Sequence, residues 1–440
     1  MWSPRRLHDL CFRLAKDATG AMTLFGLFVF LTMAVIGGLA IDVSHVHAER
    51  VRLQVMADAA AHAALVSRRK MSASAAKAEA VAMVRASDPA AERGDQLLAS
   101  DISFGVFDYA TGGFVADPSK GMAVRVSTAR LAARDNAVIS FLTQLIGFDS
   151  WDISREAVFV AYNPGCSEEG FLSEGLIDVQ SNNAYLNGFC MHSNTSVSIN
   201  NNNTFAPGTV LSMPDLSQFS MPSSGFKQND GLQAALRTAT VEIRELRDLS
   251  DIISQIQTIG AWHTPDYVTS GSVIQLSGAK FDPSDFQRGR IHRISCNGGK
   301  VQLRTRGLYT TIREAVIVTD CEVSLGSGLA FEDAVLATTS TSDKSISGSS
   351  GVRLGRVDAC LPGGSAQLLT MGGTSLPSNM HLHGSQIIAK KDITFSAGAM
   401  GVGLSLIAGG KIDGTSNMLM YRCSGGMNDN FRVDHYRLAL

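Results

Sequence analysis

The stretch AMTLFGLFVFLTMAVIGGLAI, residues 21–41, decides how the rest of the chain is arranged. It contains no charged side chain, and roughly 21 residues at about 1.5 Å each give a helix of about 31 Å, the thickness of a bilayer's hydrocarbon core. A helix satisfies its own backbone hydrogen bonds, so it is the natural structure for crossing lipid. The sequence therefore predicts a transmembrane helix over 21–41, after a cytoplasmic tail of residues 1–20.

The charges beside the apolar stretch predict its orientation. Four cations precede it: Arg5, Arg6, Arg13 and Lys16. Cationic flanks stay in the cytoplasm, so we expect a single-pass protein whose C-terminal bulk is exported. The alternative is a cleaved secretory signal, because Gly38 and Ala40 form a small-x-small pair. The stretch is longer than the apolar region of such signals, which favours a retained anchor.

The composition indicates what kind of structure is exported. The net charge of −2 gives no reason to expect nucleic acid as a partner. Aromatic residues are few, while Gly, Ser, Asn and Thr are plentiful in the second half of the chain. This composition is typical of a turn-rich β structure.

The cysteines agree with this topology. Cys11 precedes the apolar stretch, and the other six of the seven cysteines follow it. An even number of cysteines in an oxidising compartment predicts disulfides, and many connectivities are open. We expect sequence neighbours to pair: Cys166 with Cys190, Cys296 with Cys321, and Cys360 with Cys423. None has the close spacing of a zinc or redox site, so no metal or cofactor is expected.

A long amphipathic helix is expected to continue out of the membrane. Residues 42–70 contain no Gly or Pro and carry apolar side chains at helical spacing. A second helix is expected over 72–86, ending near Pro89. The Ala-rich face of the first helix lets another element approach closely, so it packs either on its own domain or on like helices in an assembly. The residues that define this interaction helix are Asp42, Leu53, Gln54, Asp58, Ala59 and Ala60.

These residues also carry a resemblance. Leu53-Gln54 and Ala57-Asp58-Ala59-Ala60-Ala61, following a membrane helix that ends in Ile41-Asp42-Val43, resemble the N-terminal module of the TadE/TadG-like family. Members are pilus-assembly proteins of the Flp, or tight-adherence, system. The resemblance implies a bacterial inner-membrane protein with a periplasmic body that serves pilus assembly or surface attachment, with other pilus-assembly proteins as its partners.

The chain departs from the family pattern in two places. Substrates of prepilin peptidase carry a Glu at a fixed place after the cleavage glycine, and that place after Gly20 is Phe25. The TadG-like branch therefore fits better than a processed pseudopilin. Some members contain a von Willebrand A metal site, Asp-x-Ser-x-Ser, but here Val46 replaces the second serine after Asp42-Val43-Ser44. Metal-dependent adhesion is therefore not expected.

The segment 42–162 is expected to be a pilin-like helical and α+β module. Alternating apolar residues predict strands over 102–108, 122–127 and 151–162, with a turn near Gly112-Gly113. The apolar spacing of 136–148 predicts a helix there, with Gly147 near its end.

A β-rich domain is expected over 163–440, beginning at the turn cluster Asn163-Pro164-Gly165-Cys166. Its short apolar segments end at Gly, Asn or Ser, which is typical of a parallel β-helix or related solenoid. Stacked asparagines at turns would account for Asn200 to Asn203. The alternative is a β-sandwich with long loops. An apolar stripe over 229–260, between Asp230 and Gly260, predicts a helical insertion that covers a sheet or binds a partner.

Few residues of the chain suggest chemistry. The pairs His45/His47 and His381/His383 lack a third metal ligand at a telling distance. Four acids could supply the paired carboxylates of a glycosidase: Asp282, Asp285, Glu332 and Asp333. Loop acids more often cap turns or face solvent. Nucleotide, zinc-protease and serine-hydrolase motifs are missing, so no catalytic residue is expected.

Together these observations predict an α+β protein: a transmembrane helix with a helical extension, a pilin-like module and a β-rich distal domain. The predicted function is that of a non-enzymatic, membrane-anchored component of Flp pilus assembly or surface adherence. Its expected partners are the inner membrane, other pilus-assembly proteins, and a surface or carbohydrate ligand. The alternatives are a membrane-tethered β-helix enzyme acting on polysaccharide, and a secreted adhesin.

Overall fold

The computed structural model describes residues 21–69, 71–89, 93–162, 164–308, 310–358, 361–396, 398–423 and 427–439. They form two compact units. The first contains the described residues up to Tyr162 together with the C-terminal residues from Tyr436 onward, and the second contains the residues in between. The second unit is therefore an insertion in the sequence of the first.

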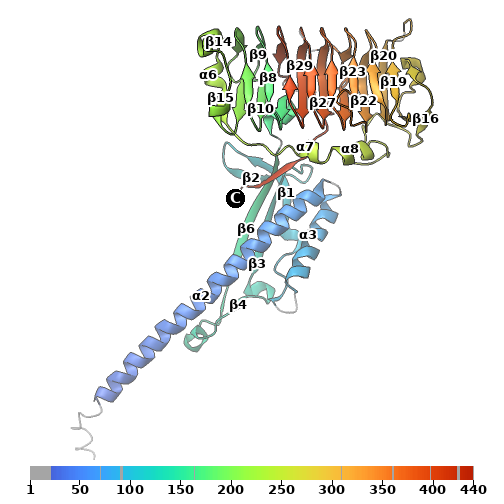
Figure 1. Cartoon of the computed structure of the whole chain (residues 1–440). Coiled ribbons are helices and arrows are strands. Elements are labelled where there is room, and N and C mark those ends of the chain that lie inside the picture. Colours follow the sequence, from blue (N-terminus) through green and yellow to red (C-terminus); the bar gives the residue numbers. More distant parts are fainter. Residues whose placement is uncertain are drawn as a thin grey trace, which may run out of the picture. The chain divides into compact units, whose positions relative to one another are not determined.

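The first unit is organised by one long helix, α2, Ala21–Arg68, of 48 residues (Figure 1). Between Met22 and Ile41 its side chains are exposed except at Gly38. Beyond Asp42 one face of the helix is buried, and many of its residues are small, among them Ala57, Ala60, Ala61 and Ala64. The second helix, α3, Ala73–Ser87, begins where the Ser72 side chain accepts a hydrogen bond from the backbone of Ala75, as capping residues do.

The same side of α2 packs on a five-stranded sheet with the order β2-β1-β3-β6-β32. The strands are β1 Ile102–Asp108, β2 Gly113–Ala116, β3 Ala123–Arg130, β6 Ile153–Tyr162 and β32 His435–Leu438. Strands β1, β2, β3 and β6 pair antiparallel. Successive side chains of a strand point to opposite faces: Val124 and Ala157 meet the helices, while Ala123 and Val158 pack on the other face.

The helix predicted over 136–148 is wrong. The chain forms a hairpin of β4, Val138–Ile139, and β5, Ser150–Trp151, joined by the short 3-10 helix η4, Thr143–Ile146. A helix would need a partner to bury its apolar stripe, but here most of the apolar side chains are exposed. Gly147, in the left-handed conformation with φ 91°, ends η4 and turns the chain back.

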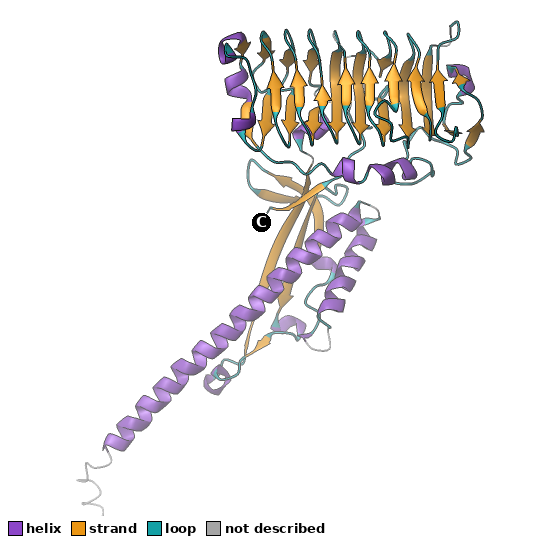
Figure 2. Cartoon of the chain, in the orientation of Figure 1, coloured by secondary structure: helices purple, strands orange, loops and turns teal. Residues whose placement is uncertain are grey.

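The second unit is a parallel β-solenoid (Figure 2). One sheet runs in the order β14-β12-β9-β31-β29-β27-β24-β22-β20-β18-β16, with further strands beside this path. Another runs β11-β8-β30-β28-β26-β23-β21-β19-β17. The recorded pairs among these described strands are parallel, for example Ile317 with Leu336 and Leu406 with Phe171. Parallel pairing between successive coils is the pattern of a solenoid, not of a β-sandwich built from hairpins.

The strands of the first sheet have the following bounds: β14 Asn229–Asp230, β12 Asn203–Phe205, β9 Ala184–Leu186, β31 Leu419–Tyr421, β29 Met400–Ala408, β27 His381–Ala389, β24 Arg353–Leu354, β22 Ala330–Thr338, β20 Thr311–Thr319, β18 Arg290–Ile294 and β16 Ile274–Leu276. Beside them lie β7 Gly170–Ser173, β10 Cys190–Ser193, β13 Val210–Met213, β15 Leu236–Thr238 and β25 Ala366–Thr370. The second sheet contains β11 Val197–Ile199, β8 Ile177–Val179, β30 Ile412–Asp413, β28 Ile393–Phe395, β26 Thr374–Leu376, β23 Ile346–Gly348, β21 Glu322–Leu325, β19 Lys300–Leu303 and β17 Lys280–Phe281.

The coils do not stack in sequence order. The chain enters at β7, in the middle of the stack, and builds coils outward to β14 and β15 at one end. It resumes at β16 at the opposite end and builds coils back to β31, which pairs with β9. The register joins the two series directly, as in Leu172 with Ile407 and Tyr185 with Met420. The solenoid therefore begins and ends at neighbouring coils.

The single helix predicted over 229–260 is also wrong. Its first part forms β14, α6 Leu232–Ala235 and β15, which continue the coils, and only α7 Arg244–Arg247 and α8 Leu249–Gln255 follow as helices. Four of the apolar side chains expected to form one stripe do cover a sheet: Ile243, Leu246, Ile253 and Ile256. Together with Leu249 and Ile252 they pack on outward residues of the long strands (Figure 1). The Lys390 ammonium group holds α7 against the sheet by donating a hydrogen bond to the Leu246 carbonyl at 2.7 Å.

Asparagines stack inside the turns, as the sequence suggests for 200–203. The Asn203 side-chain oxygen accepts from the backbone of Asn183, and the Asn229 oxygen accepts from the backbone of Asn203, both at 3.0 Å. All three residues are buried. In each case a buried backbone N–H of one coil donates to the asparagine side chain of the next coil. The stack therefore avoids the free-energy cost of a buried, unpaired donor.

Disulfides join neighbouring coils. Cys166 is bonded to Cys190, and Cys296 to Cys321. Cys423 is also disulfide-bonded. Its expected partner, Cys360, lies outside the described residues, as does Cys11.

Candidate functional site

The residues of the predicted interaction helix lie on α2, and most of them face the chain's own sheet. Leu53 and Ala60 are completely buried. The Leu53 carbonyl accepts a hydrogen bond from the Thr128 hydroxyl at 2.9 Å. Gln54 donates to Asp58 at 2.9 Å and to the Glu156 carbonyl at 3.1 Å. These motif residues therefore dock the helix on β3 and β6.

The opposite face of α2 is exposed and carries small apolar side chains beside the exposed Arg52. Ala48, Val51, Val55 and Ala59 recur three and four residues apart and all face solvent. We call these four residues the outward face. Ala59 is the only predicted interaction residue on it. The helical period in the sequence contains this second stripe, but the buried motif on the other side of the helix obscures it.

Asp42 occupies the point where the apolar part of α2 ends. Its buried carboxylate accepts hydrogen bonds from the backbone amides of Phe141 at 2.8 Å, Leu142 at 3.1 Å and Thr143 at 2.7 Å, and from the Thr143 hydroxyl at 2.7 Å. Burial would raise the pKa of Asp42, but these donors outweigh it and lower the pKa to about 2. The carboxylate therefore stays ionised and ties the β4–β5 hairpin to α2.

The acids considered for glycosidase chemistry have local structural roles. Asp282 accepts from the Ser284 amide at 3.0 Å and Asp285 accepts from the Asp282 amide at 2.8 Å, which is a reciprocal cap of a 3-10 turn. Glu332 is held between Arg313 and Arg353, each at 2.9 Å. Asp333 accepts from the Gly364 amide. Each carboxylate is thus committed to a neighbour in its own coil or the next one.

The two histidine pairs have different surroundings. The ring of His45 lies 4.6 Å from that of Phe141, while His47 is exposed. His381 and His383 stack with their ring centroids 6.4 Å apart. Burial and the neighbouring charge of His381 lower the pKa of His383, which keeps that imidazole neutral.

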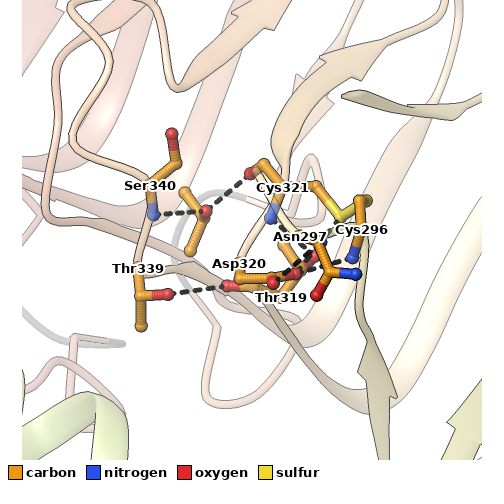
Figure 3. The surroundings of a disulfide bond; sticks show 8 residues. Cys296, Asn297, Thr319, Asp320, Cys321, Thr339 and Ser340 are labelled. Carbon is orange, nitrogen blue, oxygen red and sulfur yellow. Dashed lines mark hydrogen bonds between the residues drawn. A yellow bond between two sulfur atoms is a disulfide. The ribbon is translucent and has the colours of Figure 1, made fainter. Parts of the chain in front are cut away.

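One group of three possible metal ligands occurs among the described residues: Cys296, Asp320 and Cys321. The two sulfur atoms are bonded to each other, so neither is a thiolate ligand (Figure 3). The Asp320 carboxylate accepts from the backbone amides of Cys296 at 2.8 Å and Asn297 at 3.1 Å. The group therefore closes a turn between adjacent coils.

A cavity of about 470 Å³ lies where the solenoid's first and last coils meet. Its charged lining residues are Glu168, Glu169, Arg422 and Arg432. Burial raises the pKa of Glu169 to about 7, although a hydrogen bond from the Cys423 amide and the charge of Arg422 oppose the rise. Glu168 is paired with Arg432 at 3.3 Å. The sequence gives no signal for this cluster, because its halves are far apart along the chain.

Comparisons with known families assign the two parts of the chain separately. Residues 20–83 match the family model described as Flp pilus-assembly TadE/G-like, which associates the chain with Flp pilus assembly and its membrane machinery. Residues 170–424 match the model described as Domain of unknown function (DUF7867). No curated protein and no solved structure matches significantly. By length and composition, α2 is a helix that could cross a membrane.

Proposed function

Because the chain belongs to the family described as Domain of unknown function (DUF7867), and its N-terminal residues match a TadE/G-like module, we propose that it is a non-enzymatic, membrane-anchored component of Flp pilus assembly. Its N-terminus lies in the cytoplasm, α2 crosses the bacterial inner membrane, and the solenoid is presented on the periplasmic side. The observation that carries the proposal is α2 itself, a single uninterrupted helix with an apolar half and a docked half.

The N-terminal half of α2 supports anchoring. Its apolar side chains from Met22 to Ile41 are exposed, and the hairpin touches this part of the helix at Gly38. Burying such side chains in lipid is favourable by roughly 1.5–3 kcal/mol each. The same helix then continues without a break into the first unit, so the anchor and the folded unit share one continuous helix.

The outward face supports assembly. Ala48, Val51, Val55 and Ala59 present a slim apolar surface that another helix can approach closely. Since the opposite face is already used by β3 and β6, the outward face is the side of the extension on which other pilus-assembly proteins pack. The solenoid would then contact the pilus, a surface or a carbohydrate.

A polysaccharide-active enzyme is the second candidate, because Glu169 lines a cavity and has a pKa near that of a general acid. Its carboxylate also accepts from the Cys423 amide, where it closes the last coil on the first, and its neighbour Glu168 is paired with Arg432. These roles favour a structural function. If the Glu169→Gln variant abolished hydrolysis of envelope polysaccharide while remaining folded, the enzyme would replace our proposal.

Site-specific photo-crosslinking tests the assembly role. A photoreactive residue at Val55 in the full chain, expressed with its pilus system, should give a crosslink that mass spectrometry identifies as a pilus-assembly protein. The matched control is Val115 on β2, which is comparably exposed in the same unit. Equal crosslinking at both positions, or none at Val55, would remove the outward face from the proposal.

A further inference from the structure

The β4–β5 hairpin ends in a cluster of exposed apolar side chains. We call this cluster the hairpin tip; it consists of Ile139, Phe141, Leu142, Leu145, Ile146 and Phe148, which are between 41% and 82% exposed. No charged residue occurs from Val138 to Phe148. Single exposed apolar residues are normal on proteins, but a contiguous group of six marks a surface that is covered by something else.

The hairpin tip lies beside the apolar half of α2 (Figure 1). A Cβ atom added to Gly38 would lie 2.9 Å from the Leu142 Cβ, so the tip touches α2 one turn before Asp42. On the other side of Asp42, the Phe141 ring lies 4.6 Å from that of His45. The tip therefore straddles the point where the uncharged part of the helix ends.

Asp42 holds the tip at that level. Its carboxylate receives three backbone amides and one hydroxyl from Phe141, Leu142 and Thr143, so the loop is fixed to the helix at a defined height. The same donors satisfy the charge of Asp42, which would otherwise oppose contact with lipid. The hydrogen bonds thus do two things: they position the loop, and they make a carboxylate tolerable beside an apolar phase.

We propose that the hairpin tip inserts into the interfacial region of the bilayer leaflet from which α2 emerges, with phospholipid as its ligand. The inference rests on α2 crossing a membrane. Exposed apolar side chains on the side of α2 that the tip touches, such as Val35 and Leu31 at three and seven residues before Gly38, would be covered by the same lipid. Gly38 precedes Asp42 by about 6 Å along the helix, which agrees with the roughly 5–10 Å depth of interfacial apolar segments. The hairpin is then a second membrane contact beside α2, and it sets the tilt and rotation of the anchor.

Depth-dependent fluorescence quenching tests this inference on the full chain. Leu145→Cys, in a Cys11→Ser background with the disulfides intact, is labelled with an environment-sensitive dye and reconstituted in phosphatidylethanolamine–phosphatidylglycerol vesicles. Lipids that carry a nitroxide near the top of the acyl chain serve as the quencher. We expect at least twofold stronger quenching at Leu145 than at the control, Val115→Cys on β2. The Phe30→Cys variant, measured with lipids that carry the nitroxide near the end of the acyl chain, reports independently whether α2 itself is in the bilayer.

The outcomes separate this inference from the proposed function. Strong quenching at Phe30 and Leu145, unchanged at high dilution of protein in lipid, supports the membrane contact of the hairpin tip. Strong quenching at Phe30 with Leu145 no different from Val115 overturns it and leaves the anchor intact. Quenching at Leu145 that is no stronger than at Val115 at high protein density, and that grows only on dilution, shows that a second copy of the chain covers the tip, which also overturns it. No quenching at Phe30 overturns the anchor and the inference together.

Discussion

The two units reach stability in different ways. In the first, one helix approaches a sheet closely because its buried face is made of alanines, such as Ala57 and Ala60. In the second, stacked coils enclose large side chains, such as Phe171, Tyr185 and Phe331. Their buried carboxylates also differ: donors lower the pKa of Asp42, whereas burial raises the pKa of Glu169 and Glu245 to about 7. The first unit therefore depends on close approach and a fixed charge, and the second on filled volume.

The largest effect is expected from emptying the solenoid core. Phe331 is completely buried on β22, so Phe331→Ala should lower the unfolding free energy of the second unit by about 3–5 kcal/mol, because it removes apolar contacts and leaves a cavity. Hydrogen exchange monitored by mass spectrometry should show the loss in the solenoid, with α2 and β3 unchanged. Equal loss of protection in both units would show that they are not energetically separate.

The converse change is expected to damage the first unit. Ala60 is completely buried against the sheet, and its neighbour Ala59 is exposed. Ala60→Leu should destabilise the first unit by about 1–3 kcal/mol, because the added side chain forces the helix away from its partners. Ala59→Leu is the matched control and should change the unfolding free energy little. Equal effects of the two changes would contradict the close packing of α2 on the sheet at Ala60.

The carboxylates predict opposite pH responses. The Glu245 pKa of about 7 lies above its ordinary 4.5, because burial dominates over the amides of Glu245 and Val433 that oppose it. The folded state therefore binds this proton more tightly, so the resulting stability is complete below pH about 4.5 and is lost as the pH rises through about 7. Glu245→Gln should reduce the second unit's loss of stability between pH 5 and pH 8 by about 2 kcal/mol and leave the part that comes from Glu169.

Asp42 is the control for this pH response. Its folded pKa of about 2 lies below the ordinary value of 3.8, so its contribution is complete above pH 3.8 and is lost only as the pH falls through about 2. Denaturant unfolding of the first unit at pH 5 and pH 8 should give the same contribution from Asp42. A steeper pH dependence in the first unit than in the second would reverse the assignment.

The smallest expected change is local. Asp42→Asn keeps the shape of the side chain but weakens its bonds to the hairpin, because a neutral amide oxygen is a poorer acceptor than a carboxylate. The amides of Phe141, Leu142 and Thr143 should exchange faster with solvent, while those of β3 stay protected. Unchanged exchange in the hairpin would mean that Asp42 does not hold it.

Local patterns in the sequence predict much of this architecture, and long-range pairing accounts for the rest. The uncharged stretch 21–41 and the short segments ending at Gly or Asn are local signals, so the apolar helix and the solenoid could be predicted. The stacking of β31 on β9 could not, because it joins residues more than two hundred positions apart. The same holds for the cluster of Glu169 and Arg422.

Periodicity misled the prediction at two places for the same reason. Residues 136–148 and 229–260 both have apolar side chains at helical spacing, but spacing does not reveal what covers them. In the first segment the apolar side chains remain exposed at the hairpin tip. In the second, the early residues pair with β12 and β13 as part of a coil, and only the later ones become α7 and α8.

The membrane-anchored role is tested most directly by the place where the chain resides and by its N-terminal residue there. A C-terminally tagged full-length protein would be followed through inner-membrane, periplasmic and sheared-surface fractions, and its intact mass measured. We predict the uncleaved chain in the inner membrane, with its mass reduced by the hydrogens lost to disulfides. A species beginning at Ile41 in the medium, or one beginning at Ala21 in sheared pili, would contradict the anchored assembly component.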